Sequence, residues 1–117
     1  LGYFDNADSL RVLEMYMKSY GESKVLRSLG SASLDIVSVG LGNAEVFIDV
    51  RNKLRNFDVA AALRIVLALG SQAYVFGYSD PLDIPIDSVV KVSCIVGFNG
   101  EYLGNALRVL KRITSPD

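Results

Sequence analysis

Histidine is absent from this sequence of 117 residues, and cysteine occurs once, as Cys94. Without an imidazole, the chain excludes Ser-His-Asp hydrolysis, Cys-His catalysis and zinc sites that are rich in histidine. Because Cys94 lies in an apolar run and has no second cysteine to pair with, we expect it to act as a small core residue, which fits a cytoplasmic setting. The chemistry that remains is that of carboxylates, which are the oxygen ligands that Mg²⁺ prefers.

Long hydrophobic runs and an excess of basic residues are also absent. No apolar run approaches the roughly 18 to 20 residues of a membrane-spanning helix, and the first residues lack the basic, apolar and small-residue order of a signal peptide. The formal net charge is −1, whereas nucleic acids and anionic membranes attract surfaces with a basic excess. Since 50% of the residues are hydrophobic, we expect one soluble domain over residues 1–117, with neither nucleic acid nor membrane as a partner.

Strands and helices alternate in the hydrophobic pattern. Apolar residues at helical spacing and short apolar runs, separated by glycine and proline, define the elements. Such alternation is typical of a layered αβα domain and predicts a mostly parallel or mixed sheet of about five strands. The pattern predicts strands over residues 1–4, 23–30, 44–50, 73–78 and 89–98, and helices over residues 6–21, 31–42, 57–70 and 99–113, the last with Asn99 as its cap.

Two junctions between a strand and a helix are candidate binding sites, because parallel sheets bind ligands where the following helices point their amino termini. At the first junction, Gly30, Ser31 and Ala32 carry small side chains, so backbone N–H groups are accessible to an anion or a hydroxyl group. The alternative is that Ser31 or Ser33 simply caps the helix. At the second junction, Asp58 is either an ordinary N-cap or a metal ligand that a buried helix holds rigidly.

Several motifs follow one another in a specific order. The segment LRSLGSASLDIVSVGLGNAEVFIDVRNKLRNFDVAAALRIVLALG contains Arg-x-x-Gly-Ser-Ala, a helix, a glycine-containing turn, an acidic strand end and Phe-Asp-x-Ala-Ala. This order resembles the carboxyl-terminal half of the inositol monophosphatase family, in which many members have Trp where this chain has Phe57. The sequence FIDVRNKLRNFDVAA is most similar to the archaeal-type enzymes that hydrolyse both inositol monophosphate and fructose 1,6-bisphosphate. The resemblance extends over residues 24–99 and implies the corresponding half of that fold.

The resemblance implies roles for individual residues. By this similarity, Asp58 binds a catalytic Mg²⁺, Asp49 holds substrate hydroxyl groups, and the segment Gly30, Ser31 and Ala32 lies against the substrate. For Asp49, the alternative is a solvated strand end.

Four basic residues near these motifs are further candidates. Arg27 matches the family's arginine ahead of the small-residue segment, where it either binds substrate or has a structural or subunit-contact role. Arg51, Lys53 and Arg55 either contact a sugar phosphate or form a solvated charged loop.

The chain also departs from the family pattern. The family's other metal ligands, a Glu and an Asp-Pro-x-Asp-Gly-Thr segment, belong to an amino-terminal half. The segment SDPLDIP follows the Asp58 helix and lacks Gly-Thr, so it is not that motif. The family's Glu-Ala-Gly-Gly turn is here LALGSQ, which keeps only Gly70.

From these matches to the family pattern and departures from it, we expect the carboxyl-terminal domain of a Mg²⁺-dependent phosphomonoesterase that acts on inositol monophosphate, fructose 1,6-bisphosphate or both. Its expected partners are the missing amino-terminal domain and, in the full enzyme, a second identical subunit. Because one carboxylate does not replace a ligand cluster, the 117 residues alone are expected to be inactive. The alternative is a non-catalytic, degenerate α/β module for ligand binding or assembly.

Overall fold

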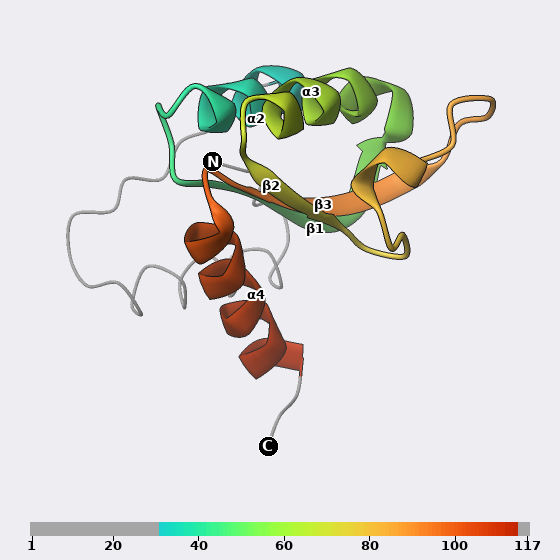
Figure 1. The fold of residues 1–117 in the computed structure, drawn as a ribbon. Coiled ribbons are helices and arrows are strands. Elements are labelled where there is room, and N and C mark those ends of the chain that lie inside the picture. The colour runs from blue at the N-terminus through green and yellow to red at the C-terminus, as the bar shows by residue number, and fades with distance from the viewer. Residues whose placement is uncertain (1–30, 115–117) are drawn as a thin grey trace.

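The computed structural model describes residues 31–114. The elements predicted over residues 1–30, together with Arg27 and Gly30, lie outside these described residues. Helices and strands are mixed along the chain, so the predicted α/β class is confirmed. In chain order the elements are α2 (Ala32–Gly40), β1 (Val46–Arg55), α3 (Asn56–Ala68), β2 (Gln72–Val75), the 3-10 turn η1 (Pro81–Asp83), β3 (Lys91–Gly97) and α4 (Gly100–Thr114) (Figure 1).

The three strands of this region form one antiparallel sheet in the order β1-β3-β2. β1 and β2 run in the same direction because α3 crosses between them, and β3 lies between the two in the opposite direction. The chain passes from β2 to β3 through a loop that contains only η1, so it reverses direction instead of crossing over. The predicted mostly parallel or mixed sheet of about five strands is therefore not confirmed within residues 31–114.

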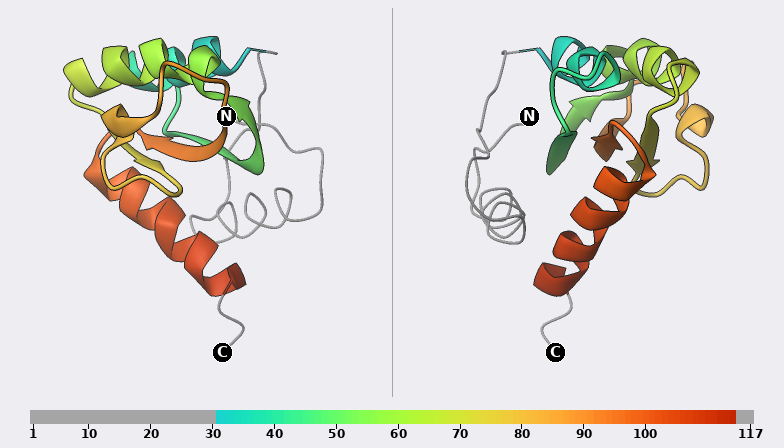
Figure 2. Two further views of the ribbon diagram at one scale, coloured as in Figure 1. Left: turned by 90° about the vertical axis from the view of Figure 1, so that its right-hand side faces the viewer. Right: turned by 60° about the vertical axis from the view of Figure 1, so that its left-hand side comes forward.

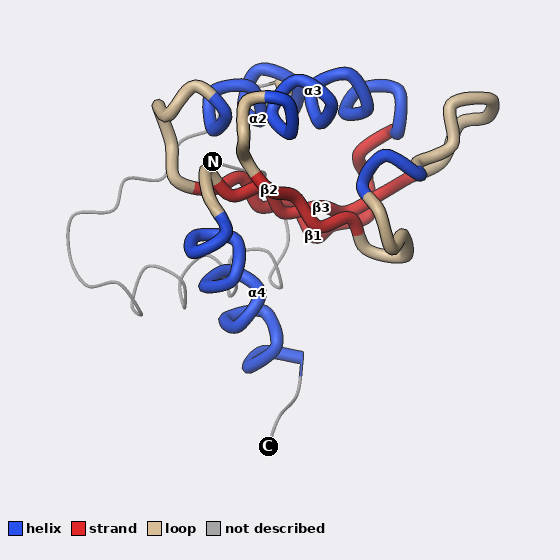
Figure 3. The backbone as a smooth tube through the Cα atoms, viewed as in Figure 1, coloured by secondary structure: helices blue, strands red, loops and turns tan. Residues whose placement is uncertain are grey.

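Helices cover both faces of the sheet. α2 and α3 lie side by side on one face, and α4 packs on the opposite face and extends beyond the sheet (Figures 1 and 2). The tube in Figure 3 shows the same helix, sheet and helix layers and the long loop between β2 and β3. Among the described helices, none combines the length and the apolar character that crossing a bilayer requires.

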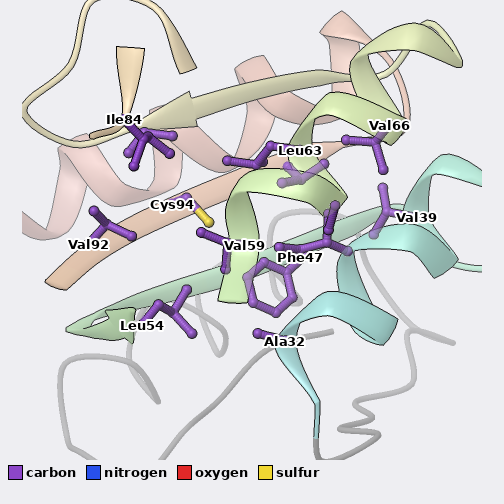
Figure 4. Packing of buried hydrophobic residues seen from close by; sticks show 14 residues of the cluster. Ala32, Val39, Phe47, Leu54, Val59, Leu63, Val66, Ile84, Val92 and Cys94 are labelled. Carbon is purple, nitrogen blue, oxygen red and sulfur yellow. The ribbon is translucent and has the colours of Figure 1, made fainter. Parts of the chain in front are cut away.

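The larger apolar cluster lies between the sheet and the helices α2 and α3 (Figure 4). Side chains alternate along a strand, so Phe47 of β1 and Cys94 and Val96 of β3 all point to this face. Gly40 lets the two helices approach closely, because a Cβ atom there would lie 2.7 Å from Cγ1 of Val66. The residues of this cluster that are fully buried are Ile36, Val39, Phe47, Val59, Leu63, Val66, Cys94 and Val96.

A smaller apolar cluster joins the other face of the sheet to α4. Val46 and Ile48 of β1 and Ile95 of β3 alternate with the residues of the larger cluster and contact Leu103, Ala106 and Val109 of the helix. The predicted cap of this helix is confirmed, because Oδ1 of Asn99 accepts a hydrogen bond from the backbone N–H of Tyr102 at 3.0 Å.

Candidate functional site

The helix α3 begins directly at the carboxyl end of β1. Arg55 occupies the N-cap position, without a side-chain capping bond, and Asp58 lies in the first turn of the helix. The interpretation of Asp58 as the N-cap is therefore wrong. Its carboxylate, 51% exposed, instead pairs with the guanidinium of Arg55, with Nε donating to Oδ2 at 3.1 Å. The carboxylate of Asp58 is thus accessible, and its partner is an equally accessible cation.

The amino-terminal turns of α2 and α3 lie against each other. Ser31 caps α2, because its Oγ accepts a hydrogen bond from the N–H of Leu34 at 3.4 Å. The interpretation of Ser31 as a helix cap is therefore confirmed. The hydroxyl of Ser33 donates to the backbone carbonyl of Asp58. Two helix amino termini, each with a partial positive charge, are thereby brought to one place.

A bulge in β1 separates its buried half from its charged half. The register with β3 moves from Asp49 opposite Cys94 to Leu54 opposite Val92, so four residues of β1 face one residue of β3. Asn52 adopts a φ of 59° at the bulge, and its N–H donates to the hydroxyl of Ser93 at 2.7 Å. Bulges bend a strand and change the direction of its side chains. The basic run is therefore part of a strand and not a loop, although the side chains of Lys53 and Arg55 are exposed as the solvated alternative required.

These elements line an open cavity of about 520 Å³ at the carboxyl end of β1. Of the predicted site residues, the cavity brings together Ser31, Ala32, Arg51, Lys53, Arg55 and Asp58. Its complete lining is Ser31, Ala32, Ser33, Arg51, Lys53, Leu54, Arg55, Asp58 and Lys91. The sequence reasoning missed Lys91, the first residue of β3, because only the strand register places it opposite Arg55.

Asp49 does not line this cavity. Its side chain is fully buried and forms two parallel bonds with the guanidinium of Arg51, from Nε to Oδ1 at 2.9 Å and from Nη2 to Oδ2 at 2.7 Å. The backbone N–H of Arg51 also donates to Oδ1 at 3.1 Å. Asp49 is therefore not a solvated strand end, and its role in holding substrate hydroxyl groups stays a prediction.

The buried pair also affects its neighbour across the sheet. Burial, and to a smaller extent the charge of Asp49, raises the pKa of the Cys94 thiol from 9.0 to about 12. The expectation that Cys94 is a core residue is confirmed, since its side chain is completely buried in the larger cluster.

The charges around the cavity favour an anion over an isolated cation. Four lining side chains, those of Arg51, Lys53, Arg55 and Lys91, are cationic, and one, that of Asp58, is anionic. Within residues 31–114, no group of three or more His, Cys, Asp or Glu side chains is placed to hold a metal ion. Among the lining residues, Asp58 is the one that carries a carboxylate, the ligand type that Mg²⁺ prefers.

Comparison with known proteins shows which family this chain resembles. No family model matches the chain. An inositol-1-monophosphatase from Aeropyrum pernix is 38% identical over 78 residues, which are 67% of this chain and 29% of that protein. A solved structure from Pyrococcus horikoshii, described as a hypothetical protein with similarities to inositol-1 monophosphatase, aligns with a TM-score of 0.69 and 24% identity over 92% of this chain and 40% of its own length. The first similarity supports the predicted family, the second supports the fold, and the chain spans less than a third of its curated relative.

Proposed function

We propose, from the similarity of this chain to the inositol monophosphatase family, that it is the carboxyl-terminal part of a phosphomonoesterase. The observation that carries the proposal is the cavity, because three segments that resemble the family and are separate in the sequence meet there. These segments are the start of α2, the end of β1 and the first turn of α3. Because the chain corresponds to 29% of the Aeropyrum pernix enzyme, the activity belongs to a larger assembly of segments.

Each residue of the cavity has a proposed task. Asp58 contributes one carboxylate to a Mg²⁺ site that other segments complete. Ser31 and Ala32, at the start of α2, lie against the polyol, and Arg51 and Arg55 balance the charge of the phosphate ester. When bound, Mg²⁺ activates water for attack on phosphorus and neutralises charge on the leaving oxygen. Asp49 acts indirectly in this proposal, because its two bonds fix the direction of Arg51.

Inositol monophosphate and fructose 1,6-bisphosphate are the proposed substrates. The test is to assay the protein that contains this chain against both esters, with and without Mg²⁺. We expect Mg²⁺-dependent hydrolysis, and we expect Asp58→Asn to lower kcat/KM by more than about 100-fold, since even the loss of a residue that only supports a metal ligand costs 10- to 100-fold.

A matched control is Asp83→Asn, which removes an exposed carboxylate that does not line the cavity. It should leave kcat/KM unchanged. The 117 residues alone should show no turnover. Full activity in the Asp58→Asn protein would remove Asp58 from the site.

A second candidate function is a non-catalytic module that binds a phosphorylated ligand. The excess of cationic side chains in the cavity favours it. The same assay distinguishes the two functions, because the module binds the esters without hydrolysing them, whatever the Mg²⁺ concentration.

Pairing of two subunits is also part of the proposal. Large apolar side chains on the outer surface of α2 and α3 support it, because an apolar helix face is usually covered in the working protein. Their exposed fractions are 60% for Leu34, 48% for Ile65 and 53% for Leu69. Sedimentation of the protein that contains this chain, with Ile65→Glu as the disrupting variant, tests the pairing.

A further inference from the structure

Lys91 and Arg55 place two cations opposite each other at the cavity. Lys91 is exposed, it is the first residue of β3, and it stands directly opposite Arg55 of β1. Like charges at directly opposed positions of a sheet destabilise the strand pair. Both side chains also line the same cavity. An anion bound between the two cations would remove this repulsion.

Other charges in the cavity do not compensate Lys91. The carboxylate of Asp58 pairs with Arg55, and that of Asp49 pairs with Arg51. In the part of the chain that the structure describes, the ammonium group of Lys91 makes no ion pair. The charge of Lys91, one of the cationic side chains in the lining, is therefore available to a ligand.

The backbone that leads to Lys91 is held firmly against the start of α3. Asn56, fully buried, donates from its backbone N–H to the carbonyl of Val90 at 2.9 Å and accepts from the N–H of Val90 at 3.0 Å through Oδ1. Its Nδ2 donates to the carbonyls of Ser88, at 2.8 Å, and Pro85. These bonds fix the backbone next to Lys91 relative to that of Arg55, so a ligand has to order only the two side chains.

We propose that Lys91 and Arg55 together bind a phosphate group of the ligand, and that Lys91 is a residue that determines specificity for anionic esters. The inference rests on the proposed function, because it names the part of the same cavity that recognises phosphate. A phosphate oxygen accepts charge-assisted hydrogen bonds from both an ammonium and a guanidinium group. The bound anion removes the repulsion between the two opposed cations, and it competes with Asp58 for Arg55.

The test uses the 117-residue chain with inorganic phosphate as the probe and EDTA present, so that no metal contributes. Affinity is measured by titration calorimetry, at constant ionic strength. We expect Lys91→Gln to weaken phosphate binding about fivefold and Lys91→Arg to stay within about twofold of the original chain, because arginine keeps the charge. The control Arg64→Gln, which removes an exposed cation of α3 outside the cavity, should have no effect.

Asp58→Asn should change phosphate binding and hydrolysis in opposite directions. In the metal-free titration it should strengthen phosphate binding, because Arg55 loses its competing carboxylate, whereas in the hydrolysis assay it should lower kcat/KM by more than about 100-fold. Equal affinity in Lys91→Gln and the original chain, or no phosphate binding by the original chain, overturns the role of Lys91. Either result leaves the hydrolysis test of Asp58 intact, so the two proposals fail separately.

Discussion

Two aspartate and arginine pairs lie on either side of the bulge in β1, and they differ in almost every physical respect. The pair of Asp49 and Arg51 has side chains that are 0% and 11% exposed and is joined by two parallel bonds. The pair of Asp58 and Arg55 has side chains that are 51% and 62% exposed and is joined by one bond. The buried pair is fixed when the chain folds, whereas the exposed pair is weak enough to exchange its partners for a ligand.

Removal of the buried carboxylate should have the largest effect on stability. Asp49→Ala removes the buried carboxylate that pairs with the almost buried guanidinium of Arg51, which costs about 3 to 5 kcal/mol of unfolding free energy. Urea denaturation followed by circular dichroism measures this loss. A loss below 1 kcal/mol would show that the buried pair is no stronger than the exposed one.

The thiol next to the buried pair should make stability depend on pH. The folded state raises the pKa of Cys94 from 9.0 to about 12, so the unfolded thiol ionises first. The stability that the buried, protonated thiol contributes is fully present below about pH 9. It is lost as pH rises towards 12, with a slope of up to about 1.4 kcal/mol per pH unit.

Cys94→Ala isolates this effect, because it removes the thiol and leaves the other groups that titrate in alkali. The difference in unfolding free energy between the two proteins should be constant from pH 7 to 8.5 and should shrink at higher pH. A constant difference up to pH 10.5 would contradict the raised pKa.

Removal of the exposed carboxylate should have the smallest effect on stability. Asp58→Asn is expected to change the free energy of unfolding by less than about 1 kcal/mol, because exposed ion pairs contribute little. The same denaturation experiment provides the measurement, and added salt should reduce the difference further. A loss as large as that of Asp49→Ala would mean that Asp58 holds the fold, and the comparison of the two pairs would no longer hold.

Local patterns in the sequence predicted the helices of the described region well. The predicted helix over residues 57–70 corresponds to Asn56–Ala68, and Asn99 caps the last helix as expected. These features depend on side-chain spacing and on bonds between near neighbours. The direction of β3 was not predictable in the same way, because it depends on pairing with strands far away in the sequence.

The candidate site was predictable in part for the same reason. Asp58, Arg51 and Arg55 lie within one short segment, so a motif identified them together. Lys91 is far from that motif in the sequence, and only the register of β3 brings it opposite Arg55. The continuous buried run of β1 ends at Asp49, but the strand continues through the bulge to Arg55 and Leu54 returns to the larger cluster, which no alternation of apolar residues reveals.

The central position of β3 constrains the order in which the chain can assemble. β1 and β2 are made earlier during synthesis than β3. Within the described sheet they do not pair with each other, and each hydrogen-bonds only to β3. Until residues 91–97 leave the ribosome, the backbone donors and acceptors of both earlier strands have no partner in this sheet. Such unpaired edges invite contact with other chains during synthesis, so a short interval between the emergence of β2 and of β3 protects the nascent protein from aggregation.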